Sequence, residues 1–91
     1  MSTESQYLEN LIEDALLVDN NEILLYNDDF NTFEHVIKML CKYCEHDSVQ
    51  AEQCAWIVHN NGKCMVKRGD MNDLMPICTA LKDAGLSAKI L

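Results

Sequence analysis

Residues 24–36, with the sequence LLYNDDFNTFEHV, join an apolar segment to a segment with helical periodicity. The apolar part belongs to a predicted buried strand, Glu22–Tyr26, which stops at three small polar residues. Asn27–Asp29 is predicted to form a turn, and Asn31 or Thr32 is predicted to cap the helix that follows. The sequence therefore predicts a polar, acidic cluster beside apolar side chains, at the point where a buried strand meets a helix.

The rest of the chain alternates between helical and strand-like patterns, and the predicted order is βααβαβ. Three helices are predicted, from Phe33 to Cys44, from Val49 to His59 after a Ser48 cap, and from Asp70 or Asn72 to Gly85. Pro76 fits the last helix if it lies in the first turns, where its missing amide hydrogen costs least. Two further strands are predicted, at Lys63–Lys67 and Leu86–Leu91.

Three short strands cannot form a core alone, so the helices are needed to cover the sheet. We therefore expect an α+β domain over residues 21–91, in which a three-stranded antiparallel sheet packs against three helices. Residues 1–20 are expected to form an N-terminal arm, part of which could be helical.

Composition and charge exclude several classes of function. The 91 residues carry a net charge of −8, and the 7 basic residues form no cluster. Binding to nucleic acid or to anionic membranes depends on Lys and Arg, so we expect neither. No apolar run approaches the roughly 20 residues that span a bilayer, and the N-terminus lacks the pattern of a secretory signal. We therefore expect a cytoplasmic protein whose partners are cationic or carry a free amine.

The 5 cysteines are expected to be free thiols in the core, because an odd number in a reducing compartment argues against disulfides. Cys41-Lys-Tyr-Cys44 has the spacing of a redox or zinc motif, but it lies inside a helical pattern. No second motif completes a zinc set at finger-like spacing. We expect no metal and no cofactor. Zinc binding remains an alternative, with further ligands from His35, His46, Cys54 or His59.

No catalytic motif is present in the sequence. The serines and threonines lie outside nucleophile motifs, no cysteine begins a helix, and neither glycine-rich phosphate-binding motif occurs. Asp28, Asp29 and His59 could form an acid–base set, but no activated nucleophile accompanies them. We therefore expect a protein that is not an enzyme.

The same polar residues offer hydrogen-bond acceptors that would suit an ammonium group. Asn27 offers an amide oxygen, Asp28 and Asp29 offer carboxylates, and neutral His59 offers a ring nitrogen. A peptide's α-amino group is mostly protonated at neutral pH and lies next to the first side chain. Acceptors beside an apolar hole would therefore recognise the amine and the first residue together. Alternatively, the acidic segment is only a turn and a helix cap, and His59 is only a surface residue.

The chain resembles the ClpS family, the adaptors of bacterial Clp proteases, from about Glu22 to Leu91. Three pieces carry the resemblance: the closing strand near Leu86 and two motifs, which are Leu24–Asp29 followed by Glu34 and Val36, and Val58-His59-x-x-Gly62-Lys63. Their combination at this separation is specific. The resemblance implies a three-stranded sheet with three helices, as the periodicity also predicts. The C-terminal domain of the ribosomal stalk protein is similar in fold but lacks both motifs.

The resemblance implies a monomeric adaptor for substrates that begin with Leu, Phe, Tyr or Trp, which it delivers to a ClpA-like or ClpC-like AAA+ unfoldase. It implies that Asn27, Asp29 and His59 hold the substrate's α-amino group, while Asp28 supports the turn. The residues implied for the side-chain pocket are Leu25, Asn31, Phe33, Val36, Ala55, Val58 and Leu86.

Three of the pocket residues depart from the family pattern. Asn31 stands where the family often has Thr, and Phe33 and Ala55 each stand where it has Met. Phe33 would reshape the mouth of the pocket and Ala55 would deepen it, so these changes affect the choice among first residues. The alternative function is a non-enzymatic interaction module of ribosomal-stalk-like fold, without a peptide pocket.

Overall fold

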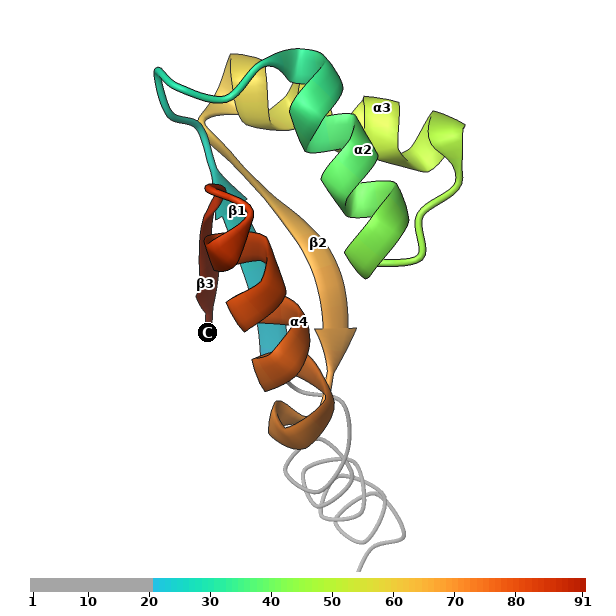
Figure 1. The fold of residues 1–91 in the computed structure, drawn as a ribbon, viewed down its shortest axis with the longest axis vertical. Helices are drawn as coiled ribbons and strands as arrows, with labels where there is room; N and C mark the ends of the chain where they lie inside the picture. Colours follow the sequence, from blue (N-terminus) through green and yellow to red (C-terminus); the bar gives the residue numbers. More distant parts are fainter. Residues whose placement is uncertain (1–20) are drawn as a thin grey trace, which may run out of the picture.

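The computed structural model describes residues 21–91, which form three strands and three helices in the order βααβαβ (Figure 1). The elements are β1 (Asn21–Tyr26), α2 (Phe33–Tyr43), α3 (Ser48–Asn61), β2 (Lys63–Gly69), α4 (Met71–Asp83) and β3 (Ser87–Ile90). The predicted α+β class and the predicted order of elements are confirmed. The predicted N-terminal arm, residues 1–20, lies outside the described residues.

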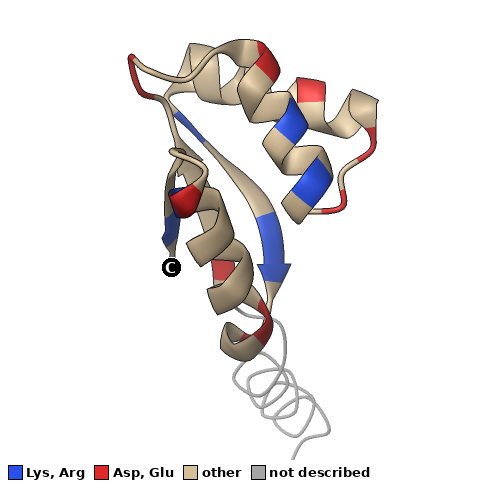
Figure 2. Cartoon of the chain, in the orientation of Figure 1, with Lys and Arg blue, Asp and Glu red and all other residues tan. Residues whose placement is uncertain are grey.

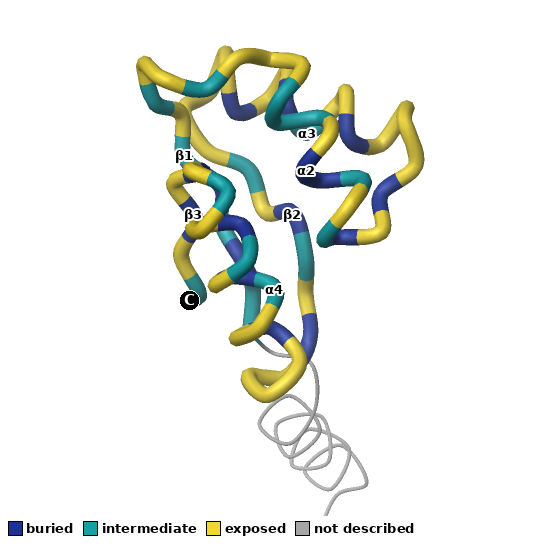
Figure 3. Tube along the Cα trace, in the orientation of Figure 1, coloured by how far each residue is buried: buried dark blue, intermediate teal, exposed yellow. Residues whose placement is uncertain are grey.

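The sheet has the strand order β2-β1-β3, and both pairings are antiparallel. Ile23 and Leu25 of the central strand β1 are buried, whereas Leu24 and Tyr26, which alternate with them, are half-buried. This alternation follows from the period of two along a strand. Figure 3 colours each residue by burial, and it shows buried positions on the sheet as well as on the helices. The helices therefore cover the face that carries Ile23 and Leu25.

Helix α4 packs over β1 and β3, whereas α3 packs against β2 and against α2 (Figure 1). Helical spacing places the buried residues of each helix on one side, namely Met39 and Leu40 in α2, Ala51, Ala55 and Val58 in α3, and Leu74, Cys78 and Leu81 in α4. All of them except Ala55 join the core cluster around β1. Among the described residues, no helix has the length and hydropathy to cross a membrane.

Short polar side chains cap the first two helices. The Thr32 hydroxyl accepts a hydrogen bond from the backbone N–H of His35 at 3.1 Å, so Thr32 rather than Asn31 caps α2. The Asp47 carboxylate accepts from the backbone N–H of Gln50 at 2.7 Å and caps α3. The prediction of Ser48 as the cap of this helix is therefore wrong by one residue.

Helix α4 begins too early in the sequence for its proline to lie in the first turn, where a proline costs least. Asp70 caps the helix through the N–H of Asp73 at 2.9 Å, and Met71 is the first helical residue. Pro76 therefore lies inside the helix, where it has no N–H to donate to the carbonyl of Asn72. Pro76 is the sixth residue of the helix and lies in its second turn, beyond the first-turn positions where a missing amide hydrogen costs least. Asn72 is exposed, so water can bind the carbonyl that the proline leaves without a donor.

Strand β2 contains a β-bulge. Two consecutive residues of β1 pair with Lys67 and Met65, so Val66 is the extra residue on β2. The Val66 carbonyl accepts a hydrogen bond from Nε2 of His46 at 2.7 Å, and His46 is only 7% exposed. The loop between α2 and α3 therefore buries a histidine because this side chain satisfies a backbone carbonyl at the bulge.

Candidate functional site

The sheet register brings the end of β1 next to the end of α3. Tyr26 at the end of β1 pairs with Lys63 at the start of β2, and the ladder continues because the Asn27 N–H donates to the Gly62 carbonyl at 2.9 Å. Gly62 ends α3 in the left-handed conformation (φ 93°), which side chains other than glycine rarely adopt. As a result, Asn27 on the strand end and His59 on the helix end lie close together.

Asp28 fixes the turn that follows β1. One carboxylate oxygen accepts from the backbone N–H groups of Phe30 (2.9 Å) and Asn31 (2.8 Å). The other oxygen accepts from the Asn31 amide (2.6 Å) and the Ser87 hydroxyl (3.2 Å). Desolvation acts to raise the pKa of Asp28, but these hydrogen bonds outweigh it and hold the pKa below its ordinary value. The geometry of the turn therefore depends on the ionised form of Asp28.

The turn and α2 are also attached to the connection between α4 and β3. Nδ2 of Asn31 donates to the Gly85 carbonyl at 2.8 Å in addition to its bond with Asp28. Nε2 of His35, in the first turn of α2, donates to the Ala84 carbonyl at 2.9 Å. The segment between β1 and α2 is therefore held on two sides, by the end of α3 and by the end of α4.

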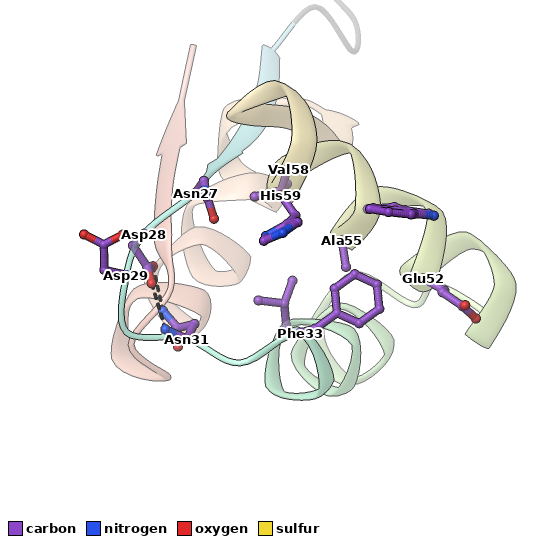
Figure 4. Close-up of a pocket in the computed structure, with 11 residues that line it drawn as sticks. Asn27, Asp28, Asp29, Asn31, Phe33, Glu52, Ala55, Val58 and His59 are labelled. Atoms are coloured by element: carbon purple, nitrogen blue, oxygen red, sulfur yellow. Dashed lines mark hydrogen bonds between the residues drawn. The ribbon is translucent and has the colours of Figure 1, made fainter.

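A cavity of about 650 Å³ lies between this segment, α2 and α3. Its lining combines polar side chains from the segment with apolar and aromatic side chains from the two helices (Figure 4). The lining residues are Asn27, Asp28, Asp29, Asn31, Phe33, Val36, Glu52, Ala55, Trp56, Val58 and His59. All the site residues predicted from the sequence, except Leu25 and Leu86, line this cavity.

The polar end of the cavity contains Asn27, Asp29 and His59. In Figure 4 the side chains of Asn27 and His59 project into the same opening, whereas the Asp29 carboxylate lies at the rim and is turned away from Phe33. All three residues are exposed, and within residues 21–91 their side chains make no hydrogen bond. Their acceptor atoms are therefore available to a ligand.

The apolar part of the cavity is formed by Val36, Ala55 and Val58. Leu25 and Leu86 are 1% and 4% exposed, and they surround a separate space of about 20 Å³ that also touches Val36 and Val58. These two leucines therefore support the apolar wall from below and do not line the main cavity. Ala55 contributes only a methyl group to this wall.

Two aromatic rings meet at the mouth of the cavity. The ring centroids of Phe33 in α2 and Trp56 in α3 are 6.5 Å apart, with an interplanar angle of 85°, which is an edge-to-face contact. The ring of His59 lies 6.4 Å from that of Trp56. Trp56 is 57% exposed, so most of its surface remains open to solvent. An aromatic contact between the helices therefore borders the opening.

Two lining residues, Glu52 and Trp56, are not predicted from the sequence. The periodicity of α3 places Trp56 on the side opposite Val58, whereas the structure places it at the same cavity. Glu52, Ala55, Trp56 and His59 are spaced at i, i+3, i+4 and i+7, so they share one face of the helix. Counting back from His59 at helical spacing would therefore have identified Glu52 and Trp56 as residues on the same face.

The cavity is acidic. Asp28, Asp29 and Glu52 line it, and its lining contains no Lys or Arg. Figure 2 shows acidic residues on the segment after β1, at the start of α2 and on α3, whereas basic residues lie further along α2 and on β2. A cationic group would therefore be favoured in the cavity and an anionic group would be repelled.

The cysteines of this protein are free, and none lines the cavity. Burial raises the pKa of Cys44 to about 11, and burial together with the neighbouring Cys64 raises the pKa of Cys54 to about 12. Thiols with such pKa values stay protonated at neutral pH and are poor nucleophiles. Within residues 21–91, no three His, Cys, Asp or Glu side chains are grouped as metal ligands. The zinc alternative therefore has no ligand set in the described part of the chain.

Comparisons with known proteins identify the family. The model of the family described as "ATP-dependent Clp protease adaptor protein ClpS" matches residues 18–89. The structure of ClpS2 from Agrobacterium tumefaciens bound to L-phenylalaninamide matches with a TM-score of 0.72 and 19% sequence identity, over 78% of this chain and 93% of that chain. At this identity the structural match shows a shared fold. No curated protein matches this chain in sequence. Because the family model spans most of the chain, this protein belongs to the ClpS family of Clp protease adaptors.

Proposed function

We propose that this protein binds substrates by their N-termini, through the free α-amino group and a bulky apolar first residue (Leu, Phe, Tyr or Trp). The observation that carries this proposal is the cavity, which places the acceptors of Asn27 and His59 beside the apolar side chains of Val36 and Val58. An interaction module without a peptide site would not need such a cavity. The alternative of a stalk-like module is therefore disfavoured.

The ammonium group of a chain start has three N–H donors and needs three acceptors. The Asn27 amide oxygen, a carboxylate oxygen of Asp29 and an unprotonated ring nitrogen of His59 supply them. The Asp29 carboxylate reaches the amine by rotation of its exposed side chain, which makes no hydrogen bond within residues 21–91. Asp28 keeps its four hydrogen bonds and adds negative charge from behind the turn.

The first side chain would enter the apolar part of the cavity, over Val36, Ala55 and Val58. Burying a Leu or Phe side chain contributes about 1.5–3 kcal/mol. Each hydrogen bond from the ammonium to the protein contributes about 1.5–3 kcal/mol, before the cost of ordering the peptide. A micromolar Kd corresponds to about −8 kcal/mol. Micromolar binding therefore requires several of the ammonium bonds together with the buried side chain.

The ligand of the Agrobacterium relative supports this assignment. L-Phenylalaninamide has a free α-amino group, a benzyl side chain and an amide, which are the groups of an N-terminal phenylalanine in a peptide. The cavity described above offers acceptors for the first group and an apolar wall for the second. We therefore expect this chain to bind the same kind of chain start.

Family membership supports the partner that we propose. A Clp protease adaptor delivers its cargo to the protease, so the partner is a Clp AAA+ unfoldase of the ClpA-like or ClpC-like kind. We propose that the adaptor acts as a monomer in the cytosol, where its free cysteines would stay reduced. A reporter protein that begins with Leu should be degraded by the purified unfoldase and protease faster when the adaptor is added.

The amine-reading site is tested with pairs of peptides that begin with Leu or Phe and differ only in N-acetylation. Acetylation removes the charge and two of the three N–H donors, so it should weaken binding by about a hundredfold or more. Fluorescence anisotropy with a C-terminal dye measures both affinities. Equal binding of the free and acetylated peptides would refute the proposal.

Variants assign the acceptors in the same assay. His59→Ala and Asp29→Ala should each weaken binding of the free peptide by about tenfold or more, because each removes one charge-assisted hydrogen bond. The melting temperature should change little. Gln53→Ala, an exposed change on α3 outside the cavity lining, is the matched control. If His59→Ala or Asp29→Ala unfolds the protein, these residues have a structural role, and their assignment as acceptors for the amine is not supported.

A further inference from the structure

We infer that Glu52, with the rings of Phe33 and Trp56, forms a second subsite that binds a Lys or Arg side chain at the second or third residue of a bound N-terminus. The inference rests on the proposed function, because the amine-binding residues set the position of the peptide. It assigns a role to Glu52 and Trp56, which line the cavity but are not needed to hold the amine.

The position of Glu52 suits a residue after the first. Glu52 precedes His59 by two turns of α3, which is about 10 Å along the helix axis. In Figure 4 it lies on the far side of Phe33 from Asn27 and Asp29. A first side chain over Val36 and Val58 would be separated from Glu52 by the contact between Phe33 and Trp56. An extended peptide advances about 3.3 Å per residue, so a long basic side chain from residue two or three covers the remaining distance.

The chemistry of the subsite suits a cation with an apolar stem. Within residues 21–91 the Glu52 carboxylate makes no hydrogen bond or ion pair, and its side chain is exposed. The Trp56 ring is 57% exposed and also borders a second concavity, of about 410 Å³, so a guanidinium or ammonium can approach it. Aromatic faces attract cations, and Arg in particular stacks on them. A carboxylate beside an open tryptophan ring therefore selects Lys or Arg.

The charge of the whole cavity strengthens this preference. Asp28 and Asp29 lie at the end where the amine is held, and Glu52 lies at the other end. No Lys or Arg of the lining opposes them. An acidic residue at position two or three would therefore meet like charge on both sides. The expected order of affinity is basic first, then alanine, then acidic.

Peptides that begin with Leu and carry Arg, Lys, Ala or Glu at position two, and a second series at position three, test the inference. With the wild-type protein, the best basic peptide should bind about three- to tenfold more tightly than its alanine counterpart at low salt. The gain should shrink in about 0.5 M salt, where charges on the surface are screened. Anisotropy measures the affinities, and N-acetylated peptides provide the amine control.

Charge reversal at the subsite gives the sharpest comparison. Glu52→Lys should reverse the order, so that the peptide with Glu binds more tightly than the peptide with Arg. The Arg peptide should bind the wild-type protein more tightly than the Lys peptide, because a guanidinium stacks on the Trp56 ring, and Trp56→Leu should reduce this advantage. Glu34→Gln removes a negative charge from the first turn of α2, outside the cavity lining, and should leave the wild-type order unchanged.

The outcomes separate the two proposals. If the free and N-acetylated forms of the Leu-Ala-Ala peptide bind equally, the proposed function is wrong, and the subsite inference is then wrong as well. If this peptide binds through its amine but the basic peptides gain nothing, only the subsite is wrong. A preference for Arg that stays the same in Glu52→Lys would also overturn the inference, because the charge at position 52 would then have no part in it.

Discussion

Replacing Asp28 by alanine should destabilise the segment that forms one side of the cavity. The Asp28 carboxylate accepts four hydrogen bonds, two from backbone N–H groups, one from Asn31 and one from Ser87. A hydrogen bond to a charged group contributes about 1.5–3 kcal/mol, but water can replace part of this set because the segment is partly exposed. We therefore expect Asp28→Ala to lower the free energy of unfolding by about 1.5–3 kcal/mol in total.

The destabilisation should depend on pH in one direction. The hydrogen bonds outweigh desolvation and lower the pKa of Asp28 in the folded protein. A group with a lowered pKa stabilises the fold above its unfolded pKa, and this contribution is lost as the pH falls through the folded pKa. The difference in unfolding free energy between wild type and Asp28→Ala should have its largest value at pH 6–7. It should decrease below about pH 4.

Urea unfolding measures this difference, with the single tryptophan, Trp56, as the fluorescent reporter. Asp29→Ala is the matched control, because Asp29 is adjacent and exposed and its side chain makes no hydrogen bond within residues 21–91. Its unfolding free energy should change by no more than about 0.5 kcal/mol. Equal destabilisation by both variants, or a difference that stays constant down to pH 3, would refute the assignment of the turn to the Asp28 carboxylate.

Three further changes test other parts of the structure. Gly62→Ala should cost about 1–2 kcal/mol in urea unfolding, from backbone strain alone, because φ is 93° and no atom lies within 4 Å of the added Cβ. His46→Ala should cost about 1–3 kcal/mol, because the Val66 carbonyl loses its donor, whereas His46→Gln should recover part of this loss. Ala55→Met should fill space in the cavity and weaken anisotropy-measured binding of a peptide that begins with Phe by about tenfold. An unchanged affinity would show that the first side chain of the peptide does not bind next to Ala55.

Local sequence signals predicted the fold well. The apolar run that ends at Tyr26, the helical spacing after Thr32 and the glycine at position 62 each act over a few residues, and their elements are found where expected. Helix starts were less certain, because adjacent residues can serve equally well as caps. Asp47 and Ser48 are both good cap residues, and only the structure shows that Asp47 accepts the bond from Gln50.

Contacts between distant segments could not be predicted in the same way. The edge-to-face contact between Trp56 and Phe33 joins α3 to α2, and the spacing along α3 alone does not reveal which ring Trp56 meets. The buried place of His46 depends on a bulge in β2, which alternation along the strand does not reveal. Leu25 and Leu86 are predicted to line the cavity, but the structure places them next to a small separate space. The sequence identifies both residues as apolar, but it does not show how far below the cavity surface packing places them.

The sheet ends on both sides in strands that are poor templates for another strand. β2 is interrupted by its bulge, which is followed at once by Lys67 and Arg68, and β3 has only four residues. Interrupted, charged or short outer strands resist edge-to-edge association, by which exposed sheets aggregate. Copies of the chain that collide in a crowded compartment should therefore separate again, instead of polymerising through their backbones.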